Sequence, residues 1–151
     1  MSFVVVGGFA AVLHGSPLPT SDIDVVPRRD PANLDRLARA LTSLGAQLRT
    51  AAGPVATTID AGFLDAMPLM LNLCTDHGDL DLTFAPTGPR QDFDAWDADA
   101  GVVEIAAGLS IRVASLDGVI DSKRAAGRDK DLRALPYLES LRDEIAGGAS
   151  T

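Results

Sequence analysis

Two aspartates, Asp22 and Asp24, stand one residue apart in an otherwise aliphatic run. Side chains at positions i and i+2 of a β-strand project from the same face. If residues 22–26 form a strand, both carboxylates share one face, while Ile23 and Val25 point into the core. Two carboxylates held side by side repel each other unless a cation lies between them. Oxygen ligands suit Mg²⁺, which also binds substrate phosphates, so the pair predicts a magnesium site.

A glycine pair, Gly7-Gly8, follows the apolar run 3–6, and thirteen residues separate it from Asp22. Glycine lets the backbone turn tightly and approach a ligand closely. A short apolar helix is expected directly after the pair, and the amides at a helix start attract phosphate. Hydroxyl groups that could donate further hydrogen bonds stand nearby, on Ser16, Thr20 and Ser21.

A third carboxylate comes from the alternating run 79–84, which pairs as a hairpin with the strand expected at 69–75. Asp79, Asp81 and Thr83 share one face of this run, and the leucines lie on the other. If it lies beside the 22–26 strand, the two are about 4.8 Å apart, and Asp81 reaches the same metals. Asp79 is the competing candidate, and a plain surface role for Asp81 stays open. Two or three carboxylates holding two Mg²⁺ ions are a standard arrangement for nucleotidyl transfer.

The remaining elements must position these groups. Asp30-Pro31 begins a helix that ends at Gly45, and Ser115 caps another. Further expected elements are a strand at 46–50, a turn at Gly53-Pro54, a short helix within 92–99, a hairpin over 102–113, and a last helix that Pro136 kinks or restarts. These elements predict an α+β fold: a small, mixed, largely antiparallel curved sheet with helices on one face. One domain over residues 1–146 and a flexible tail over 147–151 are expected.

The composition excludes several classes of protein. The chain has 151 residues, 46% of them apolar, which suits one packed domain. A net charge of −8 argues against a surface that binds nucleic acid everywhere, although it allows a local basic patch. The single cysteine cannot form an internal disulfide, which fits the reducing cytoplasm. No apolar run is long enough to span a membrane.

A dense mixture of charges covers residues 123–133. Its basic members are Lys123, Arg124, Arg128, Lys130 and Arg133. One interpretation is a solvated helix end. The other is a patch that steers a polyanionic acceptor such as RNA.

Four phrases together resemble a known superfamily: VVVGGFAAVLHG, TSDIDVVP, DHGDLDLTF and SLDGVIDSKRAAGRDKDL. The order of diglycine, Asp-x-Asp and a later strand aspartate is similar to nucleotidyltransferases of the DNA polymerase beta superfamily. The phrases most resemble its minimal members, the AbiEii-like toxins of bacterial toxin–antitoxin systems. The resemblance spans residues 3 to about 140.

The resemblance implies Mg²⁺-dependent transfer of a nucleoside monophosphate from an NTP, such as ATP, to an acceptor hydroxyl. Gly7 and Gly8 would contact the triphosphate, and two Mg²⁺ ions would be held by Asp22, Asp24 and Asp81. Asp81 would also help to activate the acceptor. Lys123 would lie near the phosphates, with Arg128 and Asp131 as weaker correspondences.

The resemblance and the basic stretch together favour a toxin that modifies the 3′ end of tRNA and has a cognate antitoxin protein. Two alternatives stay open. The chain could be an antitoxin that attaches AMP to a partner toxin, or a catalytically inactive module that only binds nucleotide.

Overall fold

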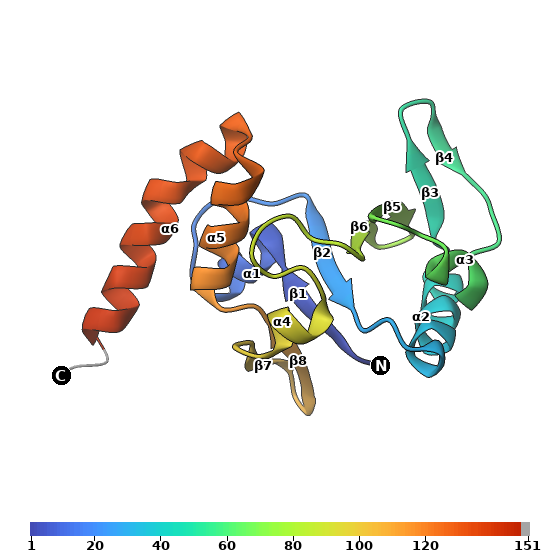
Figure 1. Cartoon of the computed structure of the whole chain (residues 1–151), viewed down its shortest axis with the longest axis horizontal. Helices are drawn as coiled ribbons and strands as arrows, with labels where there is room; N and C mark the ends of the chain where they lie inside the picture. The colour runs from blue at the N-terminus through green and yellow to red at the C-terminus, as the bar shows by residue number, and fades with distance from the viewer. Residues whose placement is uncertain (149–151) are drawn as a thin grey trace.

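The computed structural model describes residues 1–148, which form one open eight-stranded sheet and six helices (Figure 1). The strands are β1 (Phe3–Val6), β2 (Asp22–Pro27), β3 (Gln47–Thr50), β4 (Gly53–Val55), β5 (Met70–Thr75), β6 (Gly78–Thr83), β7 (Gly101–Ala106) and β8 (Leu109–Val113). The helices are α1 (Gly7–Leu13), α2 (Pro31–Ser43), α3 (Ala61–Asp65), α4 (Phe93–Asp97), α5 (Leu116–Ala126) and α6 (Asp129–Gly148).

The sheet has the strand order β4-β3-β5-β6-β2-β1-β8-β7. Two neighbouring pairs, β1 with β8 and β2 with β6, are parallel. The other neighbouring pairs are antiparallel. The α+β fold with a mixed, largely antiparallel sheet is therefore confirmed.

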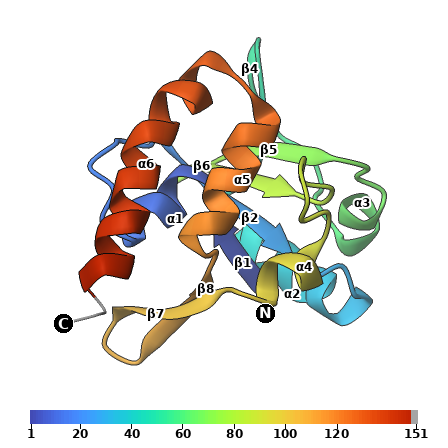
Figure 2. The same ribbon diagram turned by 60° about the vertical axis from the view of Figure 1, so that its left-hand side comes forward.

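The core lies around the central strands. Val4, Val5 and Val6 are all buried, although successive side chains of β1 point to opposite faces. On the face that carries Asp22 and Asp24, α5 and α6 line the cleft in front of the aspartates, and α6 packs against α5 (Figure 2). On the opposite face Val25 is buried in the same core as the three inward-facing leucines of α2, namely Leu34, Leu37 and Leu41.

The predicted helix ends agree with the structure. The Asp30 carboxylate accepts a hydrogen bond from the Asn33 amide at 2.9 Å and caps α2. Gly45, with φ +64°, follows the last residues of that helix. The Ser115 hydroxyl oxygen accepts from the Gly118 amide at 3.1 Å and caps α5.

Three details differ from the expectations. Gly53 and Pro54 lie in β4, opposite Thr50 and Arg49, and Pro54 is tolerated there because β4 is an edge strand. Ile23 stays 39% exposed while Val25 is 6% exposed, so the core reaches the end of β2 and not its start. The last helix does not restart at Pro136, which lies inside the continuous helix α6.

Helix α6 includes Gly147 and Gly148, the first two residues of the expected tail, and residues 149–151 lie outside the described part of the chain. Within residues 1–148, no helix has the length and apolar composition needed to cross a membrane.

Candidate active site

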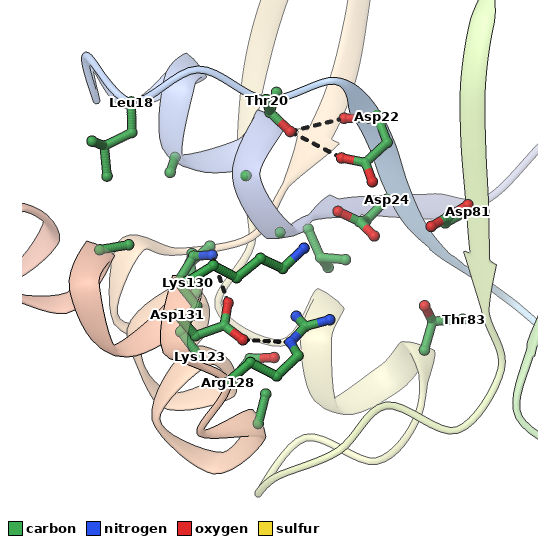
Figure 3. A pocket seen from close by; sticks show the side chains of 18 of the residues that line it. Leu18, Thr20, Asp22, Asp24, Asp81, Thr83, Lys123, Arg128, Lys130 and Asp131 are labelled. Atoms are coloured by element: carbon green, nitrogen blue, oxygen red, sulfur yellow. Dashed lines mark hydrogen bonds and ion pairs between the residues drawn. The ribbon is translucent and has the colours of Figure 1, made fainter. Parts of the chain in front are cut away.

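Three carboxylates converge where β2 and β6 run side by side. The parallel register places Asp81 opposite Asp24 and Asp79 opposite Asp22. One oxygen from each of Asp22, Asp24 and Asp81 lies within 4.8 Å of the others (Figure 3). The prediction that Asp81 reaches the Asp22/Asp24 pair is confirmed. Asp79 shares the sheet face but stands outside the group of three found among the described residues.

Both glycines make room for side chains of this site. Gly7 has φ +64°, and a Cβ there would stand 2.2 Å from the Asp24 Oδ2 atom. A Cβ on Gly8 would stand 2.8 Å from the Thr20 hydroxyl oxygen. The sequence predicted a close approach of this backbone to a ligand. The structure shows that it already approaches Asp24 and Thr20, and contact with a triphosphate stays a prediction.

The electrostatics of the group favour a bound cation. Burial, together with the negative charges of Asp22 and Asp81, raises the pKa of Asp24 to about 6. Lys123 and Lys130 act in the opposite direction without cancelling this rise. A divalent ion would remove the repulsion, and an all-carboxylate donor set fits a hard cation such as Mg²⁺. The residues present therefore fit the expected metal.

Neighbouring groups orient two of the carboxylates. The Thr20 hydroxyl donates to the Asp22 Oδ1 atom at 3.0 Å. The Arg49 Nη2 atom donates to the Asp81 Oδ1 atom at 2.6 Å, and the Nη1 atom pairs with Asp79. Asp81 is 6% exposed, so this guanidinium compensates a buried charge.

Sequence reasoning did not single out Arg49. The sequence signal that could have identified Arg49 is the alternation of side chains along a strand. Arg49 lies two residues after Gln47, so the two share a face of β3. Gln47 pairs with Cys74 and Cys74 with Asp79, which places Arg49 on the aspartate face of the sheet. Recognising this required the strand order, which places β3 two strands from β6.

Positive charges gather on the opposite wall. The Lys123 Nζ atom and the Arg128 Nε atom lie 3.1 Å and 2.5 Å from the two carboxylate oxygens of Asp131, which is fully buried. Burial acts to raise the pKa of Asp131, but its hydrogen bonds with Arg128 and Lys123 outweigh burial and hold that pKa below its usual value. Asp131 thus aligns both cations, and Figure 3 shows Lys123, Arg128 and Lys130 across from the aspartates.

A cleft of about 860 Å³ separates the two walls, a size typical of small-molecule sites. The predicted residues Gly7, Gly8, Ser16, Thr20, Ser21, Asp22, Asp24, Asp81, Lys123 and Arg128 all line it. Ser16 is buried, and its hydroxyl oxygen accepts from the Leu18 amide at 3.3 Å. The Thr20 hydroxyl is engaged by Asp22. Lys130 also lines the cleft and, among residues 1–148, has no carboxylate partner.

Comparison with known proteins adds a structural neighbour. No protein-family model and no curated protein matches the sequence. The chain is similar in structure to the lincosamide antibiotic adenylyltransferase LnuA, solved with lincomycin bound. The two are 16% identical, the match covers 93% of this chain and 87% of LnuA, and the TM-score is 0.56. At this identity the likeness shows that the two chains share a fold.

Proposed function

We propose that this chain is a metal-dependent nucleotidyltransferase that moves a nucleoside monophosphate from an NTP to an acceptor hydroxyl. One observation carries the proposal: three carboxylates from two neighbouring strands face a cleft whose opposite wall is cationic. The fold shared with an adenylyltransferase supports it. An acidic wall suits metal ions, and a basic wall suits a triphosphate, so the cleft has both parts that this chemistry needs.

Asp22, Asp24 and Asp81 would hold the metal, and two Mg²⁺ ions are expected. Bound Mg²⁺ would supply Lewis-acid polarisation and neutralise charge on the phosphates. On the opposite wall, Lys123, Arg128 and Lys130 would compensate the charge of the triphosphate. Because Asp131 already holds the side chains of Lys123 and Arg128 in place, these side chains lose little conformational freedom when the nucleotide binds.

The acceptor oxygen attacks the α-phosphorus, the bond from that phosphorus to the bridging oxygen breaks, and pyrophosphate leaves. Asp81 is suited to bind the acceptor. Arg49 hydrogen-bonds the Oδ1 atom of Asp81 and makes no hydrogen bond to its Oδ2 atom. Asp81 would hydrogen-bond the acceptor hydroxyl and help to remove its proton.

The acceptor implied by the sequence resemblance, the 3′ end of tRNA, stays a prediction, as do the toxin role and a cognate antitoxin. Three of the five cations that suggested RNA already have acidic partners. Lys123 and Arg128 pair with Asp131, and Arg124 pairs with Asp121 and Glu139. Among residues 1–148, Lys130 and Arg133 have no carboxylate partner, but Lys130 lines the cleft and would compensate the charge of the triphosphate, so Arg133 is the member of the five that stays available to a polyanion.

Incubation with Mg²⁺ and each of the four NTPs, labelled at the α-phosphate, tests the function. Transfer of label with pyrophosphate release is expected, and excess EDTA should abolish it. Asp22→Asn, Asp24→Asn and Asp81→Asn should each lose activity, while Asp35→Asn on the exposed side of α2 should not. If the unmodified protein binds NTP but neither transfers label nor releases pyrophosphate, the inactive nucleotide-binding alternative is correct.

A further inference from the structure

The wall of the cleft beside Asp81 differs in charge from the wall beside α5 and α6. Residues of β5, β6 and the following loop line it: Met70, Asn72, Thr83, Pro86 and Thr87. None of these residues is basic, and Met70 is 48% exposed. Figure 3 shows Thr83 on the strand of Asp81, apart from the lysines. The cations that line the cleft in the described part of the chain come from α5, α6 and the link between them.

Arg49 is near this wall, but its charge is already used. One end of its guanidinium pairs with Asp79 and the other with Asp81. An anionic acceptor would have to displace two carboxylates to reach this cation. Arg49 therefore serves the site by compensating its own acids and offers little to a phosphate backbone.

In-line transfer decides which wall the acceptor meets. The attacking and leaving oxygens lie on opposite sides of the reacting phosphorus. With the pyrophosphate on the basic wall, the acceptor enters from the side of Asp81, Asn72 and Met70. A protein that holds RNA uses basic groups along the backbone of the RNA, and among residues 1–148 this entry side has none free.

Resting on the proposed function, we infer that the acceptor is a small, non-anionic molecule that carries a hydroxyl group. It would bind against Met70, Asn72 and Thr83, with its hydroxyl at Asp81. Met70 supplies an apolar contact, and Asn72 and Thr83 supply hydrogen-bonding groups. The net charge of −8 also favours a non-anionic acceptor, because it disfavours the approach of a polyanion.

A partition experiment tests this inference. The purified chain, Mg²⁺ and α-labelled NTPs are incubated separately with total RNA, with total protein and with a bacterial extract freed of macromolecules by filtration. We expect label in a new acid-soluble product from the small-molecule fraction. Label on RNA or on protein would overturn the inference while leaving the transferase function intact. An absence of label and of pyrophosphate release in every fraction would overturn both.

A charge-insertion variant gives a second measurement. Met70→Lys places a cation on the acceptor wall, and Val102→Lys places the same charge on β7 at the far edge of the sheet, where the side chain is 65% exposed. For a small non-anionic acceptor, Met70→Lys should raise severalfold the amount of extract needed for half-maximal labelling, and Val102→Lys should not. Stronger labelling of RNA by Met70→Lys, with small-molecule labelling unchanged, would contradict the inference.

Discussion

Replacing Asp24 with asparagine should make the metal-free protein more stable while abolishing its activity. The pKa of Asp24 rises from 3.8 to about 6, mainly because of burial and then because of Asp22 and Asp81. A rise of about two units corresponds to about 3 kcal/mol at most, since each unit is about 1.4 kcal/mol. Asparagine has nearly the same shape and no charge, so it removes this cost.

The sign of the pH dependence follows from proton binding. Between pH 3.8 and about 6 the folded state binds more protons at Asp24 than the unfolded state does. The contribution of Asp24 to stability is therefore greatest below pH 3.8 and is lost as the pH rises through about 6. The advantage of Asp24→Asn should reach its full size near pH 8 and fall to about half near pH 5.

Thermal unfolding in EDTA provides the assay. At pH 8 we expect Asp24→Asn to unfold about 3 to 10 °C above the unmodified chain, which corresponds to roughly 1 to 3 kcal/mol for a domain of this size. Adding Mg²⁺ at about 100 times its dissociation constant should stabilise the unmodified chain by about 2.7 kcal/mol and the variant far less. Asp35→Asn, an exposed control on α2, should change neither value.

Two results would refute this reasoning. The first is a lower unfolding temperature for Asp24→Asn than for the unmodified chain at pH 8 in EDTA. That outcome would mean that the Asp24 carboxylate is stabilised by its neighbours and not strained by them. The second is an equal rise in unfolding temperature with Mg²⁺ in both proteins, which would place the metal elsewhere.

Three further predictions concern the residues around the carboxylates. Gly7→Ala should abolish the stabilisation by Mg²⁺, because its Cβ would stand 2.2 Å from the Asp24 carboxylate. Gly108 is the control, because it has φ +74° and no atom within 4 Å of a Cβ. In the same unfolding scan, Gly108→Ala should lower the unfolding temperature through backbone strain but keep the stabilisation by Mg²⁺. Arg49→Met should lower kcat about 10- to 100-fold with the KM for NTP unchanged, and Arg49→Lys should restore it only in part, because one ammonium cannot bridge two carboxylates as a guanidinium does. Asp131→Asn should raise the KM for NTP and should lower the free energy of unfolding in urea by roughly 1 to 3 kcal/mol above about pH 4, where the Asp131 ion pairs are formed. This loss of stability should shrink as the pH falls below the lowered pKa of Asp131. A loss that does not depend on pH would contradict the assignment.

Much of the local structure follows from the sequence. Alternation along 22–26 and 79–84 predicted two strands that each carry acids on one face, and the structure contains β2 and β6 there. Asp30 and Ser115 marked the starts of α2 and α5, since a capping side chain acts within its own helix turn. Such patterns are local, because a strand or a cap is determined by residues a few positions apart.

The sequence by itself determined that Asp22 and Asp24 share a strand face near a glycine hinge, because side-chain alternation holds for any strand. Tertiary structure decided which other groups join them. The parallel register of β2 and β6 selected Asp81 for the metal group, and the position of β3 brought Arg49 across the sheet to both acids of β6. The packing of α6 against α5 buried Asp131 between Lys123 and Arg128. These choices depend on strand order, register and helix packing, which arise when the whole core forms and which no short stretch of sequence contains.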